Sequence, residues 1–243
     1  MNEKKFLRIK IVLDVFGYFL SIGPCMLIWT FAYFYLQFAI DKKILLLAIL
    51  FLPLFLSLLF ILTIFIIRKI IPKLVPGKHD VGFNIPSIAW YSHLALNRAT
   101  KISGIRPILH SFYFTKFLLY NALGAKIGYG SNTSIEFVLV DVGLISMGKN
   151  CVLGEGVHIS CHYFLGTKLI LRPVVIGDNV FISSHCIIGP GSNIGDGSWI
   201  GYGNAIAGES LPANSKLDNF AWRLGGPTQP KPDYLKPLFE NKE

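Results

Sequence analysis

A six-residue spacing of isoleucine dominates the second half of the chain. Between Ile176 and Leu211, six consecutive hexapeptides each open with isoleucine, at positions 176, 182, 188, 194, 200 and 206. The fifth position of each unit carries a small or medium side chain, and the second is glycine in four units. An amphipathic helix or a half-buried strand does not produce that period, whereas a solenoid whose faces each take one hexapeptide does. The pattern predicts a parallel β-helix with the isoleucines and fifth residues pointing inward.

The hexapeptide pattern begins near Gly124 and is interrupted twice. It loses phase before Met147, and the interval from Ile159 to Ile176 contains HYFLGTKLILRP, which has no hexapeptide character. We expect a loop to leave the coil here, and loops on rigid scaffolds often carry function. The predicted coil spans residues 124–215, and the proline-rich and lysine-rich residues 216–243 form a tail.

Two long apolar runs occupy the N-terminal part of the chain. Residues 15–40 and 44–67 contain no charged side chain, and each run exceeds the roughly 20 residues that cross a bilayer. The short polar sequence Asp41-Lys42-Lys43 separates them, so residues 1–75 are predicted to form a transmembrane helical hairpin. Basic residues outside the hairpin outnumber those in its loop, which places both termini and the coil in the cytoplasm. The chain is thus predicted to be a multi-pass protein of the inner (cytoplasmic) membrane.

Residues 76–123 connect the hairpin to the coil. Two helices are expected, from Pro86 to about Thr100 and from Pro107 to Leu123, with Gly124 capping the second. Their aromatic and apolar side chains are too many for one solvated stripe. The helices are therefore expected to lie in the membrane interface, to cap the end of the coil, or to do both.

Charge and cysteine content narrow the range of partners. The formal net charge is +9, but much of the positive charge flanks the apolar runs, so anionic lipid explains it better than nucleic acid. The four cysteines show no spacing typical of a metal or redox site, and packing is their expected role.

The segment VDVGLISMGKNCVLGEGVHISCHYF, from Val140 to Phe164, followed by PVVIGDNVFISSHCIIGPGSNIGDGSWIG, resembles the core of galactoside and related sugar O-acetyltransferases. These belong to the hexapeptide-repeat acyltransferases, and the resemblance covers about residues 124–215. It implies a left-handed coil, acetyl-CoA or another acyl thioester as donor, and no metal. It also implies a homotrimer in which each active site lies between two coils.

The same resemblance suggests catalytic residues. His162 matches the family's loop histidine, which acts as general base. An imidazole suits this role because its pKa lies near neutrality and an attacking hydroxyl or amine must lose a proton. Asp141 matches an acidic position in the family and is expected to orient either the acceptor or the histidine.

Donor-binding residues are implied less completely. Ser184 and Tyr202 match positions of donor contacts, but Ala207-Gly208 replaces the threonine-lysine pair that family members carry. Lys216 or Arg223 is a candidate to replace the missing lysine. Alternatively, the donor is an acyl group held on a carrier protein.

A second resemblance covers nearly the whole chain. Two transmembrane helices, an aromatic helix running into LGAKIG at residues 123–128, and hexapeptides with one loop histidine resemble the membrane-bound terminal region of poly-lysine-synthetase-type nonribosomal peptide synthetases. This resemblance implies an aminoacyl donor and a separate carrier protein or synthetase as partner.

Two further interpretations stay open at this stage. One is a non-catalytic trimeric scaffold for a biosynthetic complex on the membrane. The other is a metal-dependent hydratase in which His158, His162 and His185 together bind the ion. The sequence does not identify the acceptor.

Overall fold

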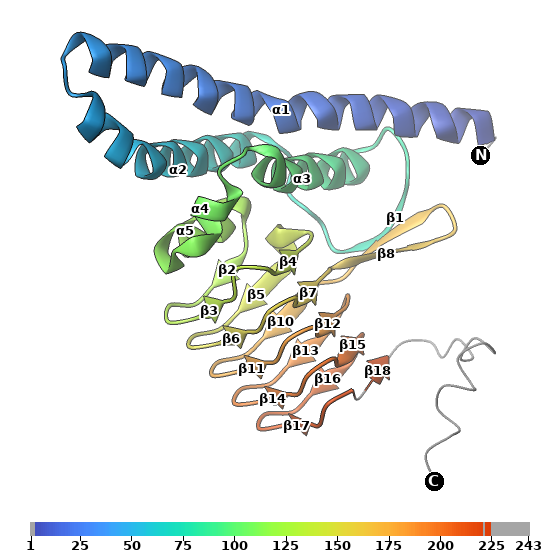
Figure 1. The fold of residues 1–243 in the computed structure, drawn as a ribbon. Helices are drawn as coiled ribbons and strands as arrows, with labels where there is room; N and C mark the ends of the chain where they lie inside the picture. Colours follow the sequence, from blue (N-terminus) through green and yellow to red (C-terminus); the bar gives the residue numbers. More distant parts are fainter. Residues whose placement is uncertain (1–2, 221, 225–243) are drawn as a thin grey trace.

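The computed structural model describes residues 3–220 and 222–224. A layer of helices lies across one end of a long coil of short strands (Figure 1). The helices are α1 (Glu3–Asp41), α2 (Leu45–Ile70), α3 (Ile85–Ile102), α4 (Arg106–Ser111) and α5 (Tyr113–Leu123), and a 3₁₀ turn, η1, covers Val142–Leu144.

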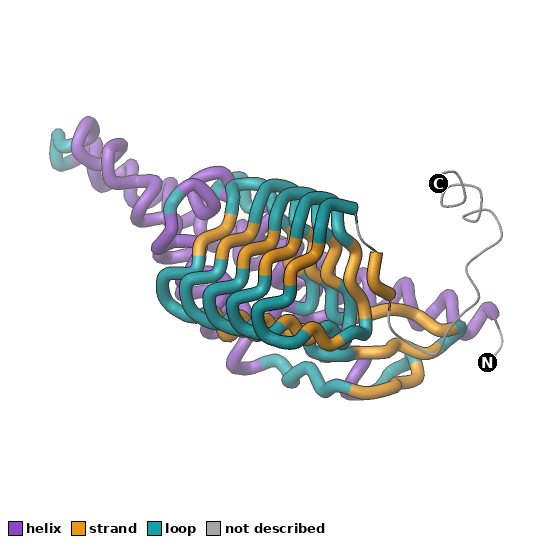
Figure 2. The backbone as a smooth tube through the Cα atoms, turned by 90° about the horizontal axis from the view of Figure 1, so that it is seen from below, coloured by secondary structure: helices purple, strands orange, loops and turns teal. Residues whose placement is uncertain are grey.

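The coil is a three-sided parallel β-helix, as the hexapeptide pattern predicted, and it fits the left-handed type that the family resemblance implied. Successive turns place their strands side by side in columns, as seen from below in Figure 2. Face 1 contains β2 (Lys126–Ile127), β5 (Ile145–Met147), β10 (Val174–Ile176), β13 (Asn193–Ile194) and β16 (Ser210–Leu211). Face 2 contains β3 (Asn132–Thr133), β6 (Val152–Leu153), β11 (Phe181–Ile182), β14 (Trp199–Ile200) and β17 (Lys216–Leu217). Face 3 contains β4 (Val138–Leu139), β7 (His158–Ile159), β12 (Ile187–Ile188), β15 (Ala205–Ala207) and β18 (Trp222–Leu224).

The repeated isoleucines form the interior of the coil, as predicted. All six are at most 2% exposed. Ile176 pairs with Ile194 and Ile188 with Ile206, so one regular turn takes three hexapeptides, one for each face. Stacked isoleucines therefore fill the same place in each turn, and the backbone hydrogen bonds between turns fix the register.

The last turn departs from the predicted phase. Ile194 pairs with Leu211 rather than with the next residue, so the final turn is one residue shorter than the regular turns. Leu211 consequently takes the inward position, and Ser210, predicted to point inward, is exposed. The coil also continues through β17 and β18, beyond its predicted end at residue 215.

The loop predicted between Ile159 and Ile176 is a β-hairpin. Strands β8 (His162–Leu165) and β9 (Lys168–Leu171) pair antiparallel, and β1 (Gly77–Asp80) adds a third strand along β9. The linker after the apolar helices therefore extends the hairpin, and Lys168 forms an ion pair of 2.5 Å with Asp80.

Helices α1 and α3 lie parallel, in a fixed register. Three side chains on α1, spaced by four residues, each donate a hydrogen bond to a carbonyl of α3 or of its C-cap residue, Ser103, at a constant offset along the chain. The bonds run from Ser21 to Ala95 (3.0 Å), from Cys25 to Ala99 (3.5 Å) and from Trp29 to Ser103 (2.9 Å). One face of α1 is thus committed to α3, and this packing fixes the position of α3.

The second predicted helix is broken. Phe112 has an extended backbone (φ −113°, ψ 138°) and separates α4 from α5, and the Thr115 hydroxyl bridges the break by donating to the carbonyls of Leu109 and Phe112. Gly124 caps α5 in the left-handed region (φ 111°), as predicted. Helix α5 covers the first turn of the coil, where Lys116 donates to the carbonyl of Thr133.

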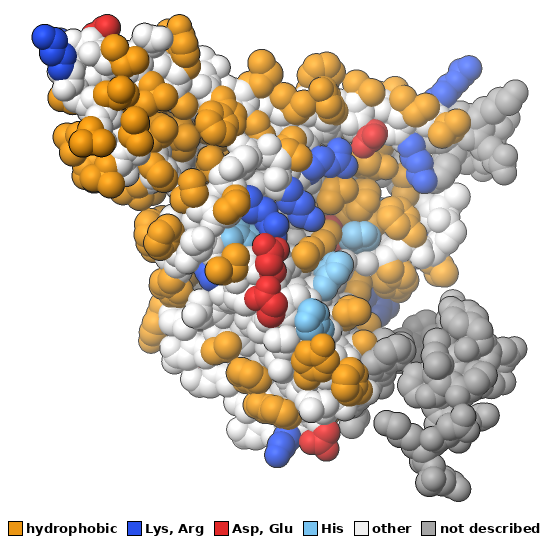
Figure 3. Space-filling model, in the orientation of Figure 1, with side chains coloured by type: hydrophobic (Ala, Val, Ile, Leu, Met, Phe, Trp, Pro, Cys, Tyr) orange, Lys and Arg blue, Asp and Glu red, His pale blue; other side chains and the backbone are white. Residues whose placement is uncertain are grey.

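By length and composition, α1 and α2 could each cross a membrane. Many of their apolar side chains are exposed, and apolar side chains gather most densely over the left part of the helical layer in Figure 3. Asp14, near the start of the first apolar run, lies 3.6 Å from the guanidinium of Arg98 on α3. Its charge therefore has a partner outside its own helix.

Core packing in the coil can be tested with two neighbouring residues on β12. Ile188 is fully buried, whereas Ile187 is 54% exposed. We expect Ile188→Ala to lower the free energy of unfolding by about 2 to 5 kcal/mol because it leaves a cavity. Ile187→Ala should change it by less than about 0.5 kcal/mol. Thermal unfolding in detergent compares the two variants, and equal destabilisation would contradict the assigned register.

Candidate active site

Asp141 lies where the first turn of the coil is longer than a regular one. Ile127 pairs with Met147, so this turn holds two residues beyond its three hexapeptides. The additional length lies at the corner between face 3 and face 1, where Asp141 has a left-handed backbone (φ 58°, ψ 44°) and precedes η1. Asp and Asn tolerate this conformation better than most residues. The longer corner brings the carboxylate to the edge of the coil.

His162 lies where the second turn is longer still. Met147 pairs with Ile176, well beyond the length of a regular turn, because the β8–β9 hairpin leaves the coil at the same corner, one turn on. His162 is the first residue of β8. The two residues are therefore neighbours on adjacent turns.

The Asp141 carboxylate accepts three hydrogen bonds. Its Oδ2 lies 2.6 Å from His162 Nδ1 and 3.2 Å from the backbone nitrogen of Cys161. Its Oδ1 accepts a bond of 2.8 Å from the indole Nε1 of Trp90 on α3. The Asp141 side chain is 2% exposed. Three donors on a buried carboxylate hold it in one orientation, which suits an ionised group that only accepts.

This contact sets the tautomer of His162. A carboxylate that accepts from Nδ1–H leaves Nε2 of a neutral imidazole as the unprotonated nitrogen. The imidazole is 22% exposed and stands against the rings of Trp90 and Phe164, with centroid distances of 5.1 and 5.9 Å. The arrangement can take a proton at Nε2 while Asp141 stabilises the resulting imidazolium.

Sequence reasoning missed Trp90 as part of this site. The predicted role of its helix was to lie in the membrane interface or to cap the coil. The one available signal was general, since a buried indole N–H usually finds a hydrogen-bond partner. Its partner, Asp141, is far away in sequence, so no local pattern indicates the contact.

Cys161, beside His162, is a free and fully buried thiol. Burial, with a smaller contribution from the negative charge of Asp141, raises its pKa to about 12. A thiol with this pKa is protonated near neutral pH, so Cys161 is not an activated nucleophile.

The other two histidines of the coil are exposed and point away from its interior, as the isoleucine phase predicted. His158 lies on face 3, and its pKa is lowered by partial desolvation and then by electrostatic interactions with Lys101 and His162. The His185 ring contacts Tyr202 at 5.4 Å. Among residues 3–220 and 222–224, no three His, Cys, Asp or Glu side chains are grouped so that they could hold a metal ion.

The candidate donor residues lie elsewhere on the coil. Ser184 and Tyr202 occupy adjacent turns at the corner between face 2 and face 3, where Gly203 donates to the carbonyl of Ser184. Face 3 therefore separates them from Asp141 and His162. Lys216 lies on face 2, with its ammonium 5.8 Å from the Trp199 ring centroid. The backbone of Arg223 pairs with Ile206 in β18, and its side chain is outside the described structure.

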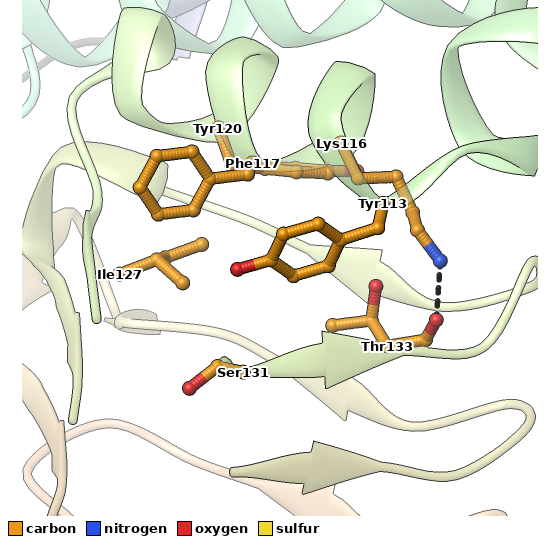
Figure 4. A pocket seen from close by; sticks show the side chains of 7 residues that line it. All are labelled: Tyr113, Lys116, Phe117, Tyr120, Ile127, Ser131 and Thr133. Carbon is orange, nitrogen blue, oxygen red and sulfur yellow. Dashed lines mark hydrogen bonds between the residues drawn. The ribbon is translucent and has the colours of Figure 1, made fainter. Parts of the chain in front are cut away.

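A small pocket between α5 and the first turn of the coil is separate from this site. Figure 4 shows its lining: Tyr113, Lys116, Phe117, Tyr120, Ile127, Ser131 and Thr133. Its volume of about 10 Å³ has room for at most one water molecule. Burial lowers the pKa of Lys116, whose ammonium caps coil carbonyls here. The pocket is a packing feature at the end of the coil.

Comparison with known proteins relates the chain to acetyltransferases. No family model matches it. Galactoside O-acetyltransferase of Escherichia coli is 32% identical over 105 residues, which cover 40% of this chain and 51% of that protein. This chain resembles the hexapeptide-repeat acetyltransferases. It spans about half the length of the curated relative it matches.

Solved structures that partly resemble the chain are also acetyltransferases. A hexapeptide-repeat-containing acetyltransferase from Vibrio cholerae is 19% identical, over 41% of this chain and 60% of that one, with a TM-score of 0.38. Another structure of that protein is a complex with acetyl coenzyme A. A maltose O-acetyltransferase from Clostridium difficile is 24% identical, over 44% of this chain and 72% of that one, with a TM-score of 0.35.

The burial of Cys161 leads to a direct prediction. N-ethylmaleimide at pH 7 should leave this thiol unmodified in the folded protein and label it after denaturation in SDS, because the thiol is both buried and protonated. A cysteine placed at Tyr163, which is 38% exposed on the adjoining strand, serves as the reactive control. Peptide mass spectrometry measures both sites, and rapid labelling of native Cys161 would contradict the geometry.

Proposed function

We propose that this protein is a membrane-anchored acyltransferase that moves an acetyl group from acetyl-CoA to a hydroxyl or amine held near the membrane. The observation that carries the proposal is the 2.6 Å contact between His162 Nδ1 and Asp141 Oδ2 at a corner of the coil. Similarity of the chain to galactoside O-acetyltransferase supports the reaction class.

In the proposed mechanism, the oxygen or nitrogen of the acceptor attacks the thioester carbonyl. His162 Nε2 takes the proton that this hydroxyl or amine loses. The new carbon–oxygen or carbon–nitrogen bond gives a tetrahedral intermediate. This intermediate collapses by breaking the carbon–sulfur bond, and the imidazolium returns its proton to the departing thiolate. Asp141 holds Nδ1–H throughout and stabilises the imidazolium. The buried, protonated thiol of Cys161 takes no part, so the acetyl group passes directly to the acceptor.

The helical layer supports an acceptor at the membrane. Helix α3 lies between α1 and the coil: its Ala95 and Ala99 carbonyls accept bonds from α1, and its Trp90 contacts Asp141. One helix diameter, about 10 Å, therefore separates α1 from the candidate catalytic residues. With α1 and α2 in a bilayer, and both termini and the coil in the cytoplasm, the reacting group lies near the headgroups.

Donor binding is proposed to use two copies of the chain. His162 and Asp141 lie on one edge of face 3, and Ser184 and Tyr202 lie on the other. A trimer that places these two edges of neighbouring coils together forms one complete site between each pair. Lys216 and Arg223 are proposed to contact the donor's phosphates, and an aminoacyl group on a carrier protein is the alternative donor.

Replacement of His162 tests the mechanism. His162→Ala should lower acetyl transfer by about 100-fold to 10,000-fold, because proton abstraction is lost. His158→Ala and His185→Ala are matched controls that should retain most activity. The assay is acetyl-CoA consumption by purified protein in lipid nanodiscs, with a panel of hydroxyl and amine acceptors, with and without a chelator.

Each alternative gives a different result in this assay. Full activity of His162→Ala would refute the mechanism. Equal loss in all three variants together with chelator sensitivity would instead support the metal hydratase. Absence of turnover in the wild-type protein with every donor and acceptor would favour the scaffold.

The shared site makes a separate prediction. A His162→Ala subunit and a Tyr202→Asp subunit are each expected to be inactive as homotrimers, the second because its charge repels the donor's phosphates. Co-expression should restore part of the activity, since some interfaces then combine an intact histidine edge with an intact donor edge. Mixing the purified homotrimers without subunit exchange is the control. Lack of restoration in mixed trimers, or a monomer by light scattering, would contradict the shared site.

A further inference from the structure

Trp90 joins the helical layer to the candidate catalytic pair. Its side chain is 6% exposed, and its indole N–H donates to Asp141 Oδ1 at 2.8 Å. The histidine uses the other carboxylate oxygen, Oδ2. Trp90 and His162 therefore hold Asp141 from its two oxygens, and their rings also contact each other edge to face, with centroids 5.1 Å apart.

The helix that carries Trp90 is fixed on both of its sides. Toward the coil, the Asn97 side chain donates a hydrogen bond of 2.7 Å to the carbonyl of Leu139, two residues before Asp141. Toward the apolar layer, two α3 carbonyls and that of the C-cap residue Ser103 accept hydrogen bonds from side chains of α1. The indole N–H therefore approaches Asp141 from a backbone that has little freedom to shift.

We propose that Trp90 is a positioning residue: its indole N–H fixes the plane of the Asp141 carboxylate, and so the orientation of the His162 imidazole. This proposal rests on the proposed function for its catalytic consequence. It goes further by assigning a role in that site to a residue of the helix that packs on α1. No residue of the repeat pattern supplies this bond.

Two consequences follow from the hydrogen bonding. Loss of the N–H to Oδ1 leaves more negative charge on the carboxylate, which favours protonated His162 and raises the pH at which the imidazole loses its proton. It also frees the carboxylate to rotate, so the imidazole spends less time aimed at the acceptor. A residue that only fills space would cause neither change when replaced by a side chain of similar shape.

Trp90→Phe removes the N–H and keeps an aromatic ring. The matched control is Trp29→Phe, which removes the same group from a bond to the Ser103 carbonyl on the same pair of helices, away from Asp141. The first readout is the rate at which diethyl pyrocarbonate modifies His162, measured at a series of pH values by fragment-ion mass spectrometry. This measurement requires no knowledge of the acceptor. The second readout is acetyl-CoA turnover in nanodiscs.

For Trp90→Phe, we expect the midpoint of the pH dependence of His162 modification to move to higher pH. We also expect kcat to fall by about tenfold, with KM for acetyl-CoA nearly unchanged. Trp29→Phe should keep the wild-type midpoint. A wild-type midpoint in folded Trp90→Phe, or the same shift in both variants, would overturn the proposal.

The proposal stays testable if Trp90→Phe does not fold. In wild-type protein labelled with ¹⁵N-tryptophan, the Trp90 indole signal should move with pH at the His162 midpoint, while the Trp29 signal stays in place. Replacing the other three tryptophans in turn assigns the signals. A Trp90 indole signal that does not shift as His162 titrates would overturn the proposal. The His162→Ala assay judges the proposed function separately, because neither the modification midpoint nor the indole signal requires turnover.

Discussion

Stacking of inward isoleucines fixes the length of each regular turn of the coil, and the position of every surface feature depends on this constraint. A turn of three hexapeptides returns each isoleucine to the same place above its predecessor, with the backbone hydrogen bonds intact. Asp141 and His162 lie at the two corners where the chain is longer, the first by a short 3₁₀ turn and the second by a whole hairpin, and these corners are neighbours. The coil thus positions this candidate catalytic pair while its interior stays packed.

The helical layer provides the second half of the site. Helix α3 is bonded to α1 on one side and to the coil on the other, and its Trp90 reaches the carboxylate that orients His162. The β1 strand adds a further link, because the linker after α2 pairs with the hairpin that begins at His162. The apolar helices and the candidate active site are therefore connected by hydrogen bonds through α3 and β1.

Much of this architecture follows from the sequence because it depends on local or periodic signals. The period of six predicted the coil, two uncharged runs predicted two long apolar helices, and Gly124 marked the end of α5. The segment HYFLGTKLILRP lacks the hexapeptide pattern, and this predicted that the chain leaves the coil near His162. Long-range contacts gave no such signal: neither the pairing of β1 with β9 nor the Trp90 bond repeats along the chain. The sequence did not reveal that the last turn is one residue short and leaves Ser210 exposed. Ile206 still fits the hexapeptide phase, and the shortening occurs after it.

In the proposed mechanism, Asp141 aims His162 Nε2 at an acyl thioester beside a membrane. The decisive experiment is a cryo-electron microscopy structure of the protein in lipid nanodiscs with bound coenzyme A. The coenzyme sulfur should lie within about 4 Å of His162 Nε2, with Nδ1 still on Asp141 and with α1 and α2 surrounded by lipid. Coenzyme A bound away from this corner, or an imidazole turned from Asp141 in the complex, would refute this mechanism.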